Sequence, residues 1–82
     1  MLNPVGNLGG VSAFAITPSD TVDLTYPVRA IYVGVGGDVS LLLREDTDPV
    51  LFKGMVSGAI YTLDVIRVYD TDTDATDIVG LR

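Results

Sequence analysis

Residues 29–44 have the sequence RAIYVGVGGDVSLLLR, in which two apolar segments flank a pair of glycines. In the first segment the larger β-branched residues occupy every second position, and this period is typical of a β-strand. Residues 36–38, Gly-Gly-Asp, suit the positive φ angles of a tight hairpin turn. The stretch therefore predicts a hairpin in which residues 39–44 return alongside residues 29–35.

Similar strand-like segments lie on both sides of this predicted hairpin. They span residues 13–17, 50–53, 59–69 and 76–81, and polar turns separate them. The segment 59–69 is long enough for a helix, but its many β-branched and aromatic residues favour a strand. About six strands with no convincing helix predict an all-β fold, a small antiparallel β-sandwich or barrel.

The first twelve residues, MLNPVGNLGGVS, differ in composition from the rest of the chain. Their glycines and asparagines raise the entropy cost of ordering, so residues 1–12 are predicted to form a flexible N-terminal arm. Residues 13–82 then form a single β-sandwich domain. The arm is either simply disordered or becomes ordered on a neighbouring subunit, for which Leu2, Val5 and Leu8 supply apolar contacts.

Composition excludes several classes of function. The 82 residues include no cysteine and no histidine, so disulfides, zinc–thiolate sites and histidine-dependent catalysis are excluded. The formal charge of −6 disfavours binding to nucleic acid, because phosphates would be repelled. No apolar run approaches the ~20 residues of a membrane helix, and residues 1–12 do not resemble a secretory signal, so the expected site of synthesis is the cytoplasm.

Hydrophobic residues nevertheless make up 48% of the chain. Residues 41–43 and 50–52 are apolar without interruption, which is typical of strands that are covered on both faces. A two-layer fold of this size has no further layer to supply that cover, so a second protein chain is expected to do so, although scattered surface apolar residues are the alternative. The candidate contact residues for a homo-oligomer or a capsid are Leu2, Val5, Leu8, Tyr32, Leu42, Leu51 and Tyr61.

The acidic segment DTDTDATD, residues 70–77, is a candidate calcium site. Asp70, Asp72 and Asp74 have the spacing that begins an EF-hand loop. However, Ala75 stands where the loop needs glycine, and Leu81 stands where it needs a bidentate glutamate. The favoured interpretation is a solvated acidic turn, and no cofactor is expected.

Groups for acid–base or nucleophilic catalysis are nearly absent. The serines have no histidine to activate them. Asp20 and Asp23 lie close together in sequence and could face Arg29, and a structural ion pair is the common outcome of such a trio. The sequence therefore predicts a protein that is not an enzyme. Its aromatic residues leave a small ligand-binding module as an alternative.

Residues 13–39 resemble the head spike base family of tailed bacteriophages and gene transfer agents. The resemblance rests on AFAITPSD at 13–20, Asp-Leu at 23–24, PVRAIYVG at 27–34 and Gly-Asp-Val at 37–39. Later features also fit, including Phe-Lys-Gly at 52–54, Arg-Val at 67–68 and the TDATDIV segment at 73–79. The similarity thus covers nearly all of the chain after Val11.

The resemblance implies a small virion structural protein on the exterior of the capsid. Such a protein would form a homo-oligomeric base that binds the major capsid protein and holds a head fibre or spike. Two features depart from the family pattern: the acidic residues at 70–74, and the absence of an aromatic residue in the closing Gly-Leu-Arg at 80–82. These departures concern the surfaces more than the fold, and a capsid decoration or cement protein is also compatible.

Overall fold

The structure is a computed structural model that describes residues 11–82. Seven strands and no helix occur in this range. The strands are β1 (Ala13–Ala15), β2 (Ala30–Val35), β3 (Gly37–Leu43), β4 (Val50–Met55), β5 (Ala59–Tyr61), β6 (Val65–Val68) and β7 (Thr76–Leu81). No helix in the described range is long and apolar enough to cross a membrane.

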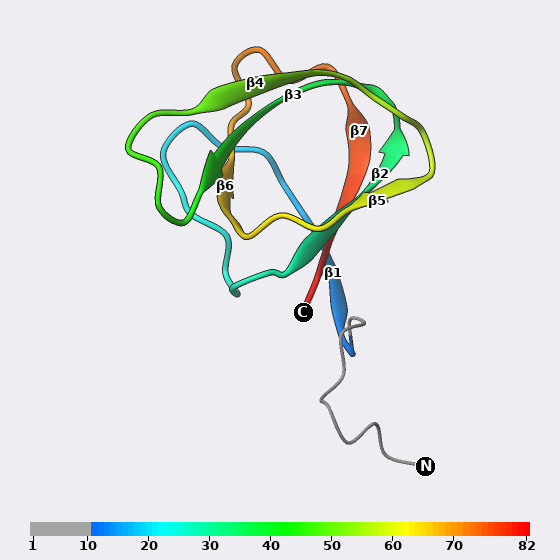
Figure 1. The fold of residues 1–82 in the computed structure, drawn as a ribbon, viewed down its shortest axis with the longest axis horizontal. Helices are drawn as coiled ribbons and strands as arrows, with labels where there is room; N and C mark the ends of the chain where they lie inside the picture. Colours follow the sequence, from blue (N-terminus) through cyan, green and yellow to red (C-terminus); the bar gives the residue numbers. More distant parts are fainter. Residues whose placement is uncertain (1–10) are drawn as a thin grey trace.

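The strands form two antiparallel sheets that enclose one core (Figure 1). The first sheet has the order β1-β7-β2-β5 and the second has the order β4-β3-β6. Strand residues at alternate positions point between the sheets, and those of β2, β3 and β6 are almost fully buried. The fully buried side chains are Ile31, Val33, Val39, Leu41, Val65 and Val68. The predicted all-β sandwich is therefore confirmed.

The predicted hairpin at residues 36–38 is wrong, because β2 and β3 lie in different sheets. The chain bends at Gly36 and continues from the first sheet into the second, as strands do at sandwich corners. This bend brings Gly36 against another segment of backbone. A Cβ atom at Gly36 would overlap the carbonyl oxygen of Met55 and lie 2.8 Å from the backbone nitrogen of Ser57. Glycine at 36 thus permits a close approach of backbones and not a hairpin turn.

The actual hairpin turns at residues 44–49, which include the polar turn that the sequence predicts at residues 45–48. β3 pairs with β4, and after the bend β2 pairs with β5, so residues 30–43 and 50–61 form one folded ribbon. The register runs from Leu41 opposite Val50 to Ile31 opposite Tyr61.

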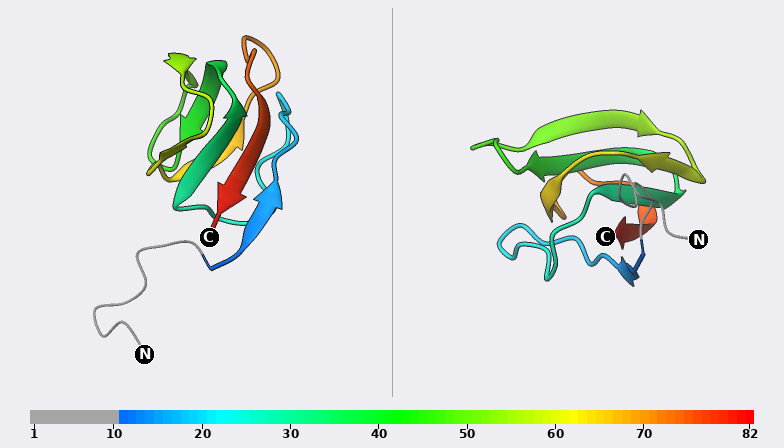
Figure 2. Two further views of the ribbon diagram at one scale, coloured as in Figure 1. Left: turned by 90° about the vertical axis from the view of Figure 1, so that its right-hand side faces the viewer. Right: turned by 60° about the horizontal axis from the view of Figure 1, so that its bottom comes forward.

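The predicted strand over residues 59–69 is instead two strands in different sheets. β5 and β6 are separated at Leu63, whose N–H donates to the carbonyl of Tyr61 at 3.0 Å in a tight turn. This second change of sheet accounts for seven strands in place of about six. Figure 2 shows the ribbon passing from one layer to the other at these corners.

The segment between β1 and β2 covers the free edge of β6. The N–H of Ser19 donates to Val68 and that of Leu24 donates to Ile66. The two ends of the described chain also pair. The N–H of Ser12 donates to the carbonyl of Arg82, and the N–H of Arg82 donates to the carbonyl of Ser12, both at 2.9 Å. Residues 11 and 12 of the predicted arm are therefore paired with the end of β7, and Leu2, Val5 and Leu8 lie outside the described residues.

Candidate assembly surfaces

An apolar row crosses the outer face of the four-stranded sheet. The register places Ala15 beside Val79, Val79 beside Tyr32, and Tyr32 beside Ile60. These residues alternate with the buried core positions of the same strands, so their side chains point away from the core. Ile60 is 59% exposed, and Tyr32 and Val79 are half-buried. We call these four residues the outer row.

The edge of the three-stranded sheet is a second apolar surface. β4 lies at this edge, and both Val50 and Leu51 are exposed there, Leu51 by 40%. Leu42, a candidate contact residue on the neighbouring strand, is only 8% exposed. The chain itself therefore covers Leu42, whereas Leu51 remains open to a partner.

Tyr61, another candidate contact residue, packs partly against the core. Its hydroxyl accepts a hydrogen bond from the N–H of Val56 at 2.9 Å, across the turn that joins β4 to β5. The structure thus gives Tyr61 a role in holding this corner. Tyr32, by contrast, belongs to the outer row.

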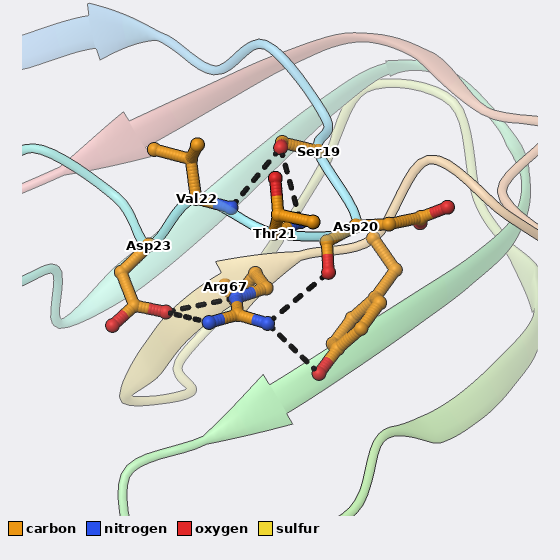
Figure 3. Close-up of polar contacts among 7 residues, drawn as sticks. Ser19, Asp20, Thr21, Val22, Asp23 and Arg67 are labelled. Atoms are coloured by element: carbon orange, nitrogen blue, oxygen red, sulfur yellow. Dashed lines mark hydrogen bonds and ion pairs between the residues drawn. The ribbon is translucent and has the colours of Figure 1, made fainter.

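Arg67 on β6 anchors the segment that covers the β6 edge (Figure 3). Its Nε and Nη2 atoms both lie 2.8 Å from one carboxylate oxygen of Asp23, and Nη1 donates to the carbonyl of Asp20 at 3.2 Å. The guanidinium also lies over the ring of Tyr69. The hydrogen bond to Asp23 raises the pKa of Arg67. Asp23 therefore forms the expected structural ion pair, but with Arg67 rather than Arg29.

Asp20 joins this covering segment to the acidic loop. Its carboxylate accepts hydrogen bonds from the N–H groups of Asp70 and Thr71 and from the hydroxyl of Thr71. These bonds, above all the one from the Thr71 hydroxyl, lower the pKa of Asp20 because they stabilise its charged form.

The acidic loop, residues 70–77, connects β6 to β7 and includes the first two residues of β7, and its four aspartates are exposed. A bond from Thr73 N–H to the Asp70 carbonyl closes the turn, and Asp72 adopts a positive φ of 68° at its tip. The calcium candidates Asp70, Asp72 and Asp74 all lie here. Within residues 11–82, no group of three acidic side chains is arranged to hold a metal ion.

Three arginines line one open pocket of about 460 Å³. Arg29 lies before β2, Arg44 follows β3 and Arg82 follows β7, and Asp64 adds a carboxylate that pairs with Arg44. The guanidinium of Arg82 stacks 3.8 Å from the ring centroid of Tyr26, which orients it. We call this site the arginine pocket. Sequence reasoning missed it because the three arginines are isolated from one another along the chain.

Comparison with known proteins finds similarity to a chain of a solved structure. No protein-family model and no curated protein matches the sequence. A solved structure described as the capsid of a native GTA (gene transfer agent) particle, computed with C5 symmetry, contains a similar chain. The identity is 34% and the TM-score 0.79, and the match covers 89% of this chain and 83% of that one.

The fold and the similarity to this capsid chain together define the class of the protein. It is a structural protein of a virion-like capsid particle. The chain belongs to the family of the gene transfer agent capsid chain that it matches. The resemblance to components of gene transfer agents is thereby confirmed at this level.

Proposed function

We propose that the protein is an oligomeric head spike base that binds the exterior of a capsid and holds a fibre or spike. The observation that carries this proposal is the match to a chain of a symmetric capsid particle over most of both chains. The motifs at residues 13–20 and 27–34 support it, because they resemble the head spike base family. The major capsid protein and a fibre or spike protein are then its partners.

The surfaces of the molecule suit this role. The outer row and the exposed β4 edge are apolar areas on two different sheets, and such areas commonly mark protein contacts. A base has to contact neighbouring copies, the shell and a fibre at the same time. Repeated contacts around a symmetry axis add avidity, so no single interface needs to be strong.

The location of the protein on capsids tests the proposal. Capsids produced without the protein are incubated with the purified chain and imaged by cryo-electron microscopy. We expect new density at the fivefold vertices, and we expect fibres to attach only to capsids that carry it. Density spread over the capsid faces would instead identify a decoration protein, and capsids that bind none of the protein would overturn both roles.

A further inference from the structure

The arginine pocket and the acidic loop lie at opposite ends of the molecule. β3 begins beside the acidic loop, where the Asp38 carbonyl accepts the N–H of Asp74, and ends beside the pocket, where Arg44 N–H donates to Asp64. β7 runs the same length, from the loop to Arg82. Figure 1 shows the loop (orange) at the top and the C-terminus at the bottom. At ~3.4 Å per residue, the two sites are about 20 Å apart.

The distribution of charge between these sites is uneven. Three of the five basic residues of the chain line the arginine pocket, together with one aspartate. The acidic loop has four aspartates within eight residues, and three of them line a separate hollow of about 280 Å³. The acidic turn after Arg44 contributes no residue to the lining of the arginine pocket. The pocket is thus a cationic recess in a chain whose net charge is −6.

We propose that the arginine pocket receives the acidic loop of a neighbouring copy of this chain. A single chain cannot make this contact with itself, because its strands hold the two sites apart. A closed ring can make it at every subunit, since each copy donates one loop and accepts one in a head-to-tail interface. The inference rests on the oligomeric role proposed above and assigns one of its interfaces.

The geometry of both partners suits this contact. Asp72 lies at the exposed tip of the acidic loop, where it can enter a recess. Stacking on Tyr26 holds the Arg82 side chain in one position, so less conformational entropy is lost when it binds a carboxylate. Arginine is also the side chain best suited to bind carboxylates with two parallel hydrogen bonds.

Variants of the full chain that each remove one charge test the contact. Their self-association is measured by sedimentation velocity at low and high salt. Asp72→Asn keeps a residue that tolerates positive φ and removes the charge, and Arg82→Gln removes the charge from the pocket. We expect each variant to associate at least tenfold more weakly than the parent protein at low salt, and high salt to weaken the parent similarly. Asp46→Asn removes the same charge as Asp72→Asn from the turn that follows β3, and it should associate as the parent does.

A disulfide test locates the contact directly, because the chain has no cysteine of its own. Asp72→Cys and Ser12→Cys proteins are mixed under oxidising conditions, since Ser12 lines the arginine pocket. We expect mixed disulfide dimers from this pair and few from Asp72→Cys with Thr21→Cys, because Thr21 is exposed but does not line the arginine pocket. Equal yields from the two pairs would overturn the proposed contact.

The capsid-binding assay separates this inference from the proposed function. If Arg82→Gln self-associates as the parent does but binds capsids more weakly, the pocket receives an acidic segment of the capsid and the copy-to-copy contact is wrong. If the variants lose self-association while the parent fails to bind capsids, the contact stands and the spike base role fails.

Discussion

Asp20 binds Thr71 through both the backbone and the side chain of that residue, although 51 positions separate them in the sequence. The N–H of Thr71 lies 2.9 Å and its hydroxyl 2.5 Å from the Asp20 carboxylate oxygens. This relationship connects the segment that covers β6 to the acidic loop. It therefore links the segment that covers the edge of β6 to the loop that we propose enters the arginine pocket of a neighbouring copy.

Replacing Asp20 with asparagine is expected to lower the melting temperature, because a neutral amide replaces the carboxylate that accepts charge-assisted hydrogen bonds from Asp70 and Thr71. The pKa of Asp20 is lowered from its ordinary 3.8 in the folded state. The stabilisation is therefore complete above pH 3.8 and is lost as pH falls through the lower folded-state value. Thermal melts of parent and Asp20→Asn between pH 2 and pH 7 measure this difference.

Asp48→Asn is the control for this experiment, because it removes the same charge from the exposed turn at residues 44–49. The difference between the two variants should shrink in acid. A gap between the two melting temperatures that is the same at every pH would show that the Asp20 carboxylate contributes nothing through its charge.

Gly36→Ala is expected to destabilise the fold strongly, by about 3 kcal/mol or more, because the new methyl group meets backbone at the corner. Gly58→Ala serves as the matched control. Gly58 has a positive φ of 78° but open space around it, so only the backbone strain of about 1 kcal/mol applies. Urea unfolding measures both values, and equal losses would argue against close packing at the corner.

Ile60→Lys is expected to weaken self-association while leaving the fold intact. The side chain lies at the exposed end of the outer row, so the change in unfolding free energy should stay within about 0.5 kcal/mol. Light scattering over a range of concentrations measures the oligomer. Val22→Lys, at a residue of similar exposure on the segment between β1 and β2, is the control. An unchanged oligomer in Ile60→Lys would exclude the outer row as a subunit interface.

Deletion of residues 1–10 is expected to reduce capsid attachment and to preserve the β-sheet circular dichroism spectrum. The deletion removes Leu2, Val5 and Leu8 but keeps Ser12, whose backbone pairs with Arg82. Cosedimentation with capsids measures attachment. If the sheet signal is lost, the N-terminal segment is needed for folding and is not a separate arm.

The positions of the strands were largely predictable because alternation and turn residues are local signals. The polar turn predicted after residue 44 lies within the turn at residues 44–49, and the strand at 76–81 occurs where the sequence predicts it. Pairing was less predictable. Glycines at 36 and 37 suit both a hairpin and a sheet corner, and only the long-range contact of Gly36 with the segment after β4 distinguishes the two.

For the candidate sites too, the residue types could be predicted from the sequence, but their burial and partners could not. Leu42 and Leu51 are both apolar residues in apolar runs, yet Leu42 is buried by its own chain and Leu51 is exposed. Asp23 was paired in prediction with the nearby Arg29, whereas the fold brings it to Arg67. Sequence distance gives no measure of spatial distance in a sandwich whose strands pair across long separations.

The amino-acid sequence alone predicted the all-β class and the polar turns and established the absence of histidine and cysteine, because residue type and two-residue periodicity report on each segment independently. Tertiary structure alone placed Arg29, Arg44 and Arg82 around one pocket and the acidic loop at the other end. The reason is physical: antiparallel pairing places segments that are distant in sequence side by side, and which strand ends come together depends on the whole set of sheet contacts.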